Sequence, residues 1–151
     1  MRRAHRLITG QRDSPVASRY VSFMACPFCA LPHARIVAEA PLTFTIRDAY
    51  PVSPGHTLVI PKRHMASLAE VTLEEQVALL RAIAQARVDL DADLHPDAYN
   101  IGINDGVAAG QTVMHLHVHL IPRFIGDVPN PRGGVRHCVP GKRRYHPVAG
   151  E

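Results

Sequence analysis

The sequence has no tryptophan, only three cysteines, and an aromatic content of 5% over its 151 residues. So few cysteines argue against a disulfide framework. No apolar run approaches the ~20 residues that span a bilayer, and the basic N-terminus lacks the apolar stretch of a signal peptide. These absences exclude a membrane-spanning class and predict a cytoplasmic protein. A chain of this length buries about two-thirds of its unfolded surface, so it needs no metal merely to fold.

Charge is distributed unevenly along the chain. Residues 1–20 carry five arginines and one aspartate, and residues 131–151 carry five basic residues and one glutamate, so each end is +4. The whole chain is also +4, which leaves residues 21–130 at −4. A nucleic-acid-binding domain usually carries its basic surface on the folded body, so we expect no nucleic-acid partner. The basic ends are solvated tails or, at the C-terminus, a segment that folds back to a phosphate-rich ligand.

The composition predicts three parts. Residues 1–23 show no sustained periodicity and are expected to be a flexible basic extension, after which Met24 offers an alternative start. Residues 24–130 contain the periodic segments and are expected to form one domain. Residues 131–151 are expected to form a basic tail.

Strand patterns dominate the predicted domain. Residues 34–39 and 42–47 have the β-branched content of a hairpin, and the apolar run 57–61 is typical of a buried strand that ends at proline. Residues 99–104 and 115–121 also alternate with period two. We therefore predict an α+β fold, an antiparallel sheet of about five strands with one main helix packed on it.

The predicted helix runs from Leu73 to about Asp91. Thr72 followed by Glu75 is typical of a capping box at its start. Apolar residues recur at helical spacing and predict the face that packs on the sheet. This face contains Val77, Leu80, Ala84 and Val88, widened by Leu73, Leu79, Ile83 and Leu90.

Three histidines alternate with aliphatic residues in the segment His115-Leu116-His117-Val118-His119-Leu120. On a strand, alternate side chains point to opposite faces, so the three imidazoles would line one surface. A single histidine there would be an ordinary polar residue. Three in strict alternation indicate either a metal site or nucleophilic catalysis at phosphorus, and the sequence permits both.

The pair Cys26 and Cys29 forms a CxxC motif, which is typical of a redox pair, half of a zinc site, or coincidence. It lacks the βαβ context of a thioredoxin-like site, so the redox interpretation is weak. Alternatively, the two cysteines have no chemical role and are simply small apolar side chains packed in the interior.

Four segments together resemble one family. GQTVMHLHVHLIPR and GHTLVIPKRH, with IRDAYPVSPGH and NDGVAAGQ, are similar to the motifs of the histidine triad superfamily of nucleotide hydrolases and transferases. The resemblance extends from Cys26 to about Arg123. It implies the fold of that superfamily and chemistry at the α-phosphate of a nucleotide.

The resemblance also implies roles for individual residues. His117 would be the nucleophile that forms a nucleotidyl-histidine intermediate, His119 would act in acid–base catalysis, His115 would orient the nucleophile or bind metal, and His56 would be a fourth active-site histidine. Residues implied to bind substrate are Asp48 at the ribose, Ile46 in the base pocket, and Asn104, Gln111 and Thr112 at the phosphate and leaving group. Asp48 could equally form the turn before Pro51.

Cofactors and substrates are implied in the same way. Cys26, Cys29, His64 and His115 would form a closed Cys₂His₂ structural zinc site, and Mg²⁺ could assist but is not required. The substrates indicated are dinucleoside polyphosphates with adenine or another purine. The alternatives are a nucleoside phosphoramidase and a nucleotide-binding interaction module with incidental turnover. A homodimer is expected by resemblance.

Overall fold

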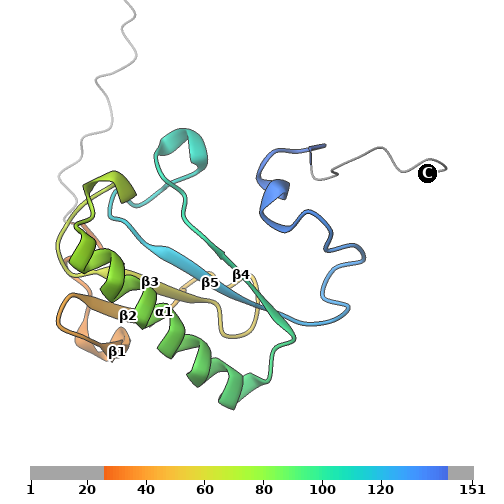
Figure 1. Ribbon diagram of the computed structural model, residues 1–151, viewed down its shortest axis with the longest axis horizontal. Helices are drawn as coiled ribbons and strands as arrows, with labels where there is room; N and C mark the ends of the chain where they lie inside the picture. The colour runs from red at the N-terminus through yellow and green to blue at the C-terminus, as the bar shows by residue number, and fades with distance from the viewer. Residues whose placement is uncertain (1–25, 143–151) are drawn as a thin grey trace, which may run out of the picture.

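The computed structural model describes residues 26–142, and the predicted extension 1–23 lies outside them, as do residues 143–151. The described chain forms a five-stranded antiparallel sheet in the order β1-β2-β3-β5-β4, with helix α1 across one face (Figure 1). The predicted α+β fold is therefore confirmed. The strands are β1 (Ile36–Glu39), β2 (Thr43–Arg47), β3 (Thr57–Pro61), β4 (Ala98–Gly102) and β5 (Val118–Arg123), and the helices are α1 (Leu73–Leu94) and the short 3₁₀ helices η1 (His33–Arg35), η2 (Leu68–Glu70), η3 (Val107–Ala109) and η4 (Gly134–Cys138).

The strand that carries the histidines begins later than the alternation predicts. Strand β5 starts at Val118, so His115 and His117 precede it and only His119 lies within it. The reason lies in the backbone, because Leu116 N–H donates to the carbonyl of Met65 at 2.6 Å, in the loop after β3. The predicted strand 115–121 is wrong at its first three residues, where the chain is tied to a loop.

The two faces of the sheet bury different sets of side chains. Val59, Val118 and Leu120 pack under α1 against Leu79 and Leu90. The opposite face is covered by residues around the CxxC segment, where Phe28 and Leu31 pack on a second cluster. Members of that cluster are Phe44, Ile46, Leu58 and Ile60. Within residues 26–142, no helix is long and apolar enough to cross a membrane.

Helix α1 has the predicted start, and only part of its predicted apolar face packs on the sheet. Thr72 Oγ1 accepts from Glu75 N–H at 3.2 Å and Glu75 Oε2 accepts from Thr72 N–H at 2.9 Å, which confirms the capping box. The helix continues past Asp91 to Leu94. Its buried residues are Glu75, Leu79, Ala86 and Leu90.

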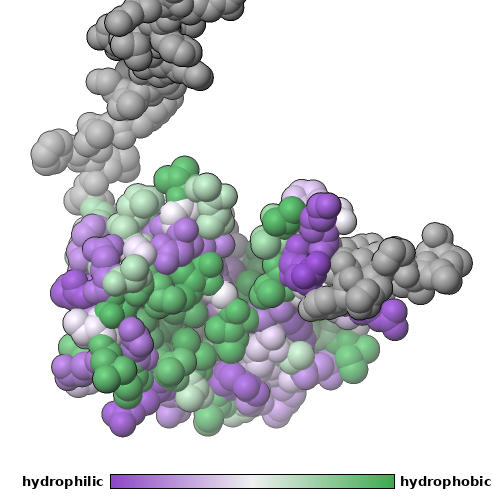
Figure 2. Space-filling model, turned by 45° about the horizontal axis from the view of Figure 1, so that its top comes forward, coloured by the Kyte–Doolittle hydropathy of each residue, from purple (hydrophilic) through white to green (hydrophobic). Residues whose placement is uncertain are grey.

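The predicted packing face is thus confirmed at Leu79 and Leu90 and wrong at Leu80 and Val88, which are 67% and 61% exposed. The buried and exposed stripes are both apolar, and the small side chain of Ala86 lets the helix approach the sheet along the buried one. Hydrophobic side chains consequently remain at the surface, and Figure 2 shows them gathered on one face of the molecule.

An ion pair connects the end of β3 to the start of α1. The guanidinium of Arg63 donates to both carboxylate oxygens of Glu75, each at 2.8 Å, and Arg63 Nη2 also donates to the carbonyl of Glu70 at 2.8 Å. The Glu75 side chain is 9% exposed. Because Arg63 immediately precedes His64, this contact also fixes the backbone of a candidate metal ligand.

The Arg63–Glu75 contact predicts a pH-dependent contribution to stability. The hydrogen bond from Arg63 lowers the pKa of the Glu75 carboxyl from 4.5 to about 2. A lowered carboxyl pKa stabilises the fold above pH 4.5, and that stability is lost as the pH falls towards 2. We expect Glu75→Gln to lower the Tm by several degrees at pH 7 and to have progressively less effect between pH 4.5 and 2.

Thermal unfolding across this pH range measures the effect. Glu74→Gln, at the exposed neighbouring position, is the matched control and should leave Tm nearly unchanged. A Tm difference between parent and Glu75→Gln that stays constant from pH 7 to pH 2 would contradict the expectation.

Candidate functional site

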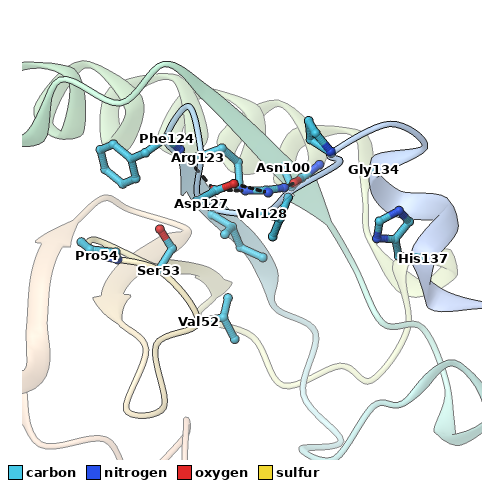
Figure 3. Close-up of a pocket in the computed structure, with 12 residues that line it drawn as sticks. Val52, Ser53, Pro54, Asn100, Arg123, Phe124, Asp127, Val128, Gly134 and His137 are labelled. Carbon is cyan, nitrogen blue, oxygen red and sulfur yellow. Dashed lines mark hydrogen bonds and ion pairs between the residues drawn. The ribbon is translucent and has the colours of Figure 1, made fainter. Parts of the chain in front are cut away.

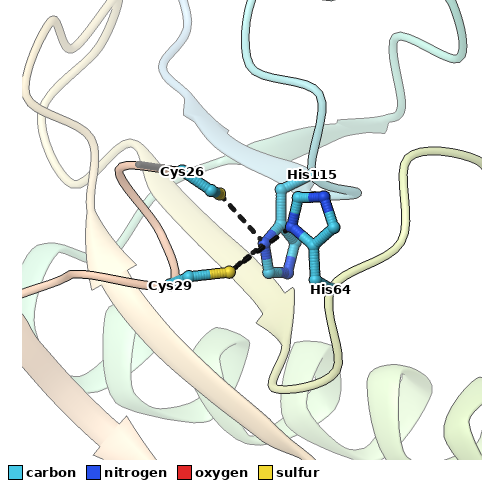
Figure 4. Close-up of side chains that lie close together, drawn as sticks. All are labelled: Cys26, Cys29, His64 and His115. Atoms are coloured by element: carbon cyan, nitrogen blue, oxygen red, sulfur yellow. Dashed lines mark hydrogen bonds between the residues drawn. The ribbon is translucent and has the colours of Figure 1, made fainter. Parts of the chain in front are cut away.

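The CxxC segment meets two histidines beside the sheet. Cys26 Sγ lies 3.4 Å from His115 Nδ1, and Cys29 Sγ lies 3.4 Å from His64 Nδ1 and 3.5 Å from His115 Nδ1. Figure 4 shows the four side chains converging on one point. Their four candidate ligand atoms all lie within 4.8 Å of one another.

These distances fit a tetrahedral metal site. Bonds of about 2.3 Å to sulfur and about 2.05 Å to nitrogen, at the tetrahedral angle, place the two ligand atoms roughly 3.5 Å apart. The observed sulfur–nitrogen distances of 3.4–3.5 Å match that spacing. Two thiolates and two imidazoles are a preferred donor set for zinc, so these residues could hold that ion.

The ring of His115 is oriented by its second nitrogen. Its Nε2–H donates to the carbonyl of Pro61 at 2.8 Å, and the residue is completely buried. A proton on Nε2 leaves a lone pair on Nδ1, directed at the cysteine sulfurs. Such a backbone partner on the opposite nitrogen is typical of metal-binding histidines.

His117 is oriented as a nucleophile. Its Nδ1–H donates to the carbonyl of His115 at 2.7 Å, which leaves the lone pair on Nε2. The edge-to-face ring of Phe28, with centroids 5.3 Å apart, packs beside the imidazole. A neutral imidazole held in this tautomer can attack an electrophilic phosphorus through Nε2.

His119 lies next to His117 and is connected to two residues behind it. The ring centroids of His117 and His119 are 5.0 Å apart. His119 Nδ1 is 3.0 Å from His56 Nε2, and His56 Nδ1 is 3.4 Å from Asp48 Oδ2. Among the described residues, His119 Nε2 is the buried side-chain nitrogen or oxygen that has no hydrogen-bond partner. That atom is therefore available to a ligand.

His56 can occupy either neutral tautomer. Its Nδ1 is 3.4 Å from an acceptor, Asp48 Oδ2, and 3.4 Å from a donor, Val52 N–H. If Nδ1 accepts from Val52, the proton on His56 Nε2 points to His119 Nδ1, and His119 carries its own proton on Nε2. If Nδ1 carries the proton, His56 Nε2 accepts from His119 Nδ1, and His119 Nε2 becomes a base.

The pKa values of this pair are set by burial. Burial lowers the pKa of His56 despite the opposing effect of Asp48. Burial, followed by repulsion from His117 and His56, lowers the pKa of His119 to about 4. Both rings are therefore neutral at pH 7 in the protein alone.

The register of the sheet places His119 between an apolar cluster and an open area. Ile46 pairs with Leu58, Leu58 pairs with His119, and His119 pairs with Gly102, so the four lie in one row across the sheet. Gly102 has no side chain, and a Cβ at this position would meet no atom within 4 Å. The surface beside His119 is consequently open towards β4.

The residues expected to bind substrate differ in their surroundings. Asp48 Oδ1 accepts from Tyr50 N–H at 2.9 Å, the contact expected of a turn-forming aspartate, while Oδ2 faces His56. Ile46 is only 2% exposed and packs in the apolar cluster. Asn104 lies beside the loop at Gly110, where a Cβ would be 4.0 Å from its amide nitrogen.

Gln111 and Thr112 lie in the loop that precedes the histidines. Both ends of the Gln111 amide are bound within the protein, because Nε2 donates to the carbonyl of Ala66 and Oε1 accepts from Gly106 N–H, each at 2.8 Å. Its side chain thus shapes the loop, whereas Thr112 is exposed beside it.

Residue patterns gave no sign of two supporting contacts. Phe28 packs on the rings of both His115 and His117. The CxxC motif does not predict this contact, because the motif specifies only its two cysteines. Asp105 accepts from Ser67 Oγ and Leu68 N–H, each at 3.1 Å, and so joins the loop after β4 to the loop after β3.

Known proteins match the part of the chain that carries the site. The family model described as the HIT domain matches residues 32–126. An uncharacterized HIT-like protein of Mycobacterium tuberculosis is 41% identical over 115 residues, which cover 69% of this chain and 75% of that protein. A bis(5'-nucleosyl)-tetraphosphatase (asymmetrical) of Schizosaccharomyces pombe is 45% identical over 77 residues, which cover 51% of this chain and 42% of that protein.

A solved structure with a similar fold carries a metal. The Zn-bound histidine triad family protein from Mycobacterium smegmatis superposes with a TM-score of 0.63 at 38% identity, covering 68% of this chain and 78% of that one. The family match begins at residue 32, so it includes His64 and His115 but not Cys26 and Cys29. The thiol half of the candidate metal centre is therefore supported by geometry rather than by the family match.

Proposed function

Because the chain belongs to the HIT domain family, we propose that it hydrolyses dinucleoside polyphosphates at the α-phosphate through a covalent intermediate on His117. It is an enzyme of the nucleotide hydrolase kind, and the similar tetraphosphatase supports the substrate class. One observation carries the proposal. His117 presents its Nε2 lone pair beside His119, whose buried Nε2 has no partner within the described chain.

In the first half-reaction, His117 Nε2 attacks the α-phosphorus and the bond from that phosphorus to the leaving oxygen breaks. The negative charge of the bound polyphosphate favours one added proton on the His56–His119 pair, and Asp48 balances it. His119 Nε2–H then gives its proton to the leaving oxygen, while His119 Nδ1 receives the proton of His56 Nε2. The pair ends neutral, with a lone pair on His119 Nε2.

In the second half-reaction, the same lone pair acts as a base. A water molecule attacks the α-phosphorus, its proton moves to His119 Nε2, and the bond between phosphorus and His117 Nε2 breaks. The nucleoside monophosphate leaves, and His117 regains its neutral ring with Nδ1–H bound to His115. Two displacements thus replace one difficult attack by water.

Two other functions fit parts of the same site. A nucleoside phosphoramidase would use the same histidines with an amine as the leaving group. A nucleotide-binding interaction module would need the binding surface but no oriented nucleophile, so the His117–His115 hydrogen bond favours turnover. We propose that the base of the substrate is a purine, adenine or another, as the resemblance to the histidine triad superfamily implies.

For the metal centre, the proposal is a structural zinc ion held by Cys26, Cys29, His64 and His115. The zinc-bound relative and the tetrahedral spacing of the four ligand atoms support it. When bound, the ion would supply a cross-link between the CxxC segment and the backbone that orients His117. No chemical step passes through it.

A homodimer through the outer edge of β4 is also part of the proposal. Within residues 26–142, β4 pairs with β5 alone. Ile101 on this strand is 42% exposed, and Leu80 on α1 is 67% exposed; both line one groove between the two elements. Burial of this apolar surface against a second copy would remove it from water.

Removal of the nucleophile tests the mechanism. We expect His117→Ala to lower kcat by roughly 10³-fold or more, since the covalent step has no substitute. Binding of the mononucleotide product, measured by titration calorimetry, should persist because other residues contact it. Rapid alkaline quench of the parent protein with diadenosine tetraphosphate, followed by mass spectrometry, should reveal an adduct on His117.

The matched control is His33→Ala, because the His33 side chain is 88% exposed and remote in sequence from the histidine segment. This variant should keep the parental kcat. A His117→Ala protein that retained most of its kcat would refute the covalent mechanism.

The metal proposal predicts zinc content and stability. Protein purified without chelators should hold about one equivalent of zinc by plasma emission spectrometry. Combined Cys26→Ser and Cys29→Ser substitution should remove the zinc and lower Tm by several degrees, since the cross-link is lost. Cys138→Ser, at an exposed cysteine outside the cluster, should change neither quantity. Parent protein without zinc would exclude the assigned ligand set.

A further inference from the structure

A cavity lies on the same face of the sheet as His119, with a volume of about 330 Å³. Its lining includes Val52, Asn100, Ile121, Val128 and His137. Figure 3 shows Asn100 and Val128 near the centre of the lining, with Val52 and His137 apart from each other at its margins. Figure 2 shows a hollow between the main body and the C-terminal segment that carries η4. This cavity, called here the distal cavity, falls within the ~300–1,000 Å³ of small-molecule sites.

The distal cavity continues the catalytic surface along β5. Ile121 follows His119 on the same face of the strand, and Asn100 is its cross-strand partner. The loop that contains Val52 leads into His56, and Ser53 Oγ in this loop donates to the carbonyl of Pro122 at 2.7 Å. Within β5, Ile121 lies two residues beyond His119, or about 6.7 Å along the strand, and His117 lies further back along the chain.

The C-terminal segment closes the cavity on its second side. Gly134 at the start of η4 has φ +40°, and a Cβ there would lie 3.3 Å from Asn100 Nδ2. A glycine is thus required for η4 to approach β4 this closely. Of the described arginines in this segment, neither Arg132 nor Arg136 lines the cavity, to which the segment contributes Pro131, Gly134 and His137.

The charge of the distal cavity favours a neutral ligand over a phosphate. Arg123 is its one lining cation of fixed charge, and the carboxylate of Asp127 neutralises it through two hydrogen bonds of 2.6 and 2.8 Å. Between the apolar side chains, two polar side chains can form hydrogen bonds with a ligand. Asn100 uses Oδ1 to accept from Arg123, which leaves its amide N–H groups, and His137 uses Nε2 to donate to the carbonyl of Arg132, which leaves Nδ1 as an acceptor.

We propose that the distal cavity binds the second nucleoside of a dinucleoside polyphosphate, the one that departs with the phosphate chain. The inference rests on the proposed function, because it assigns a position to that substrate's leaving group. Apolar walls with a few hydrogen-bonding groups suit a flat heterocyclic base. The separation from His117 suits a leaving group with several phosphates, whereas the amine of a phosphoramidate is too short to reach the cavity.

Two substrates with the same number of phosphates isolate this contact. Diadenosine tetraphosphate carries the second nucleoside, and adenosine 5'-tetraphosphate lacks it. We expect the parent protein to show a kcat/KM about tenfold higher for the former, since only that substrate fills the distal cavity. Adenosine 5'-phosphoramidate serves as a third substrate that has no phosphate chain beyond the α-phosphate.

Filling the cavity should remove the preference. Val128 is 38% exposed at the cavity wall, and Val128→Trp is expected to reduce the ratio of the two tetraphosphate kcat/KM values to about one. Val52→Trp repeats the test from the opposite wall, at a residue that is 73% exposed and so tolerates a larger side chain. Val139→Trp, in the same C-terminal segment but outside the lining, is the matched control and should retain the tenfold ratio.

The outcomes separate this inference from the proposed function. Equal kcat/KM values for the two tetraphosphates in the parent, or a ratio unchanged in both filled variants, would overturn the distal cavity as a nucleoside site while leaving catalysis intact. If the parent released AMP from none of the three substrates and formed no adduct on His117, the proposed function itself would fail.

Discussion

The buried imidazole of His115 makes the contacts on which the rest of the site depends. Its Nε2–H is held by the carbonyl of Pro61 at the end of β3, and its Nδ1 faces the sulfurs of Cys26 and Cys29. Its backbone carbonyl in turn accepts from His117 Nδ1 and fixes the tautomer of the nucleophile. One residue therefore joins the candidate metal centre, the sheet and the proposed nucleophile, and a shift of its ring would move all three.

The motifs in this arrangement could be predicted from the sequence because their signals are local, whereas the grouping of Cys26 and Cys29 with His64 and His115 was implied only by the family resemblance. The alternating histidines, the CxxC motif and the capping box each place their residue types at a spacing that only a few structures satisfy. The fold class followed from strand-like segments around one long amphipathic helix. These features depend on neighbours within about ten residues, which a sequence displays directly.

The parts that could not be predicted depend on tertiary contacts. The start of β5 moved to Val118 because Leu116 bonds to Met65, and no local pattern near His115 reports that distant carbonyl. Helix α1 carries two apolar stripes, and only packing against the sheet decides that the stripe with Ala86 is buried. Gln111 was expected, by resemblance, to bind the phosphate or leaving group, yet both ends of its amide are bound within the protein.

The electrostatics of the site connect substrate binding to catalysis. Burial lowers the pKa of His56 and lowers that of His119 to about 4, so the His56–His119 pair carries no charge at neutral pH. A polyphosphate brings the negative charge that makes an added proton favourable, and Asp48 lies behind His56 to balance it. In the proposed mechanism, His119 therefore becomes a proton donor when a phosphate binds. An uncharged ligand in the same place would meet two neutral rings and a nucleophile with no acid beside it.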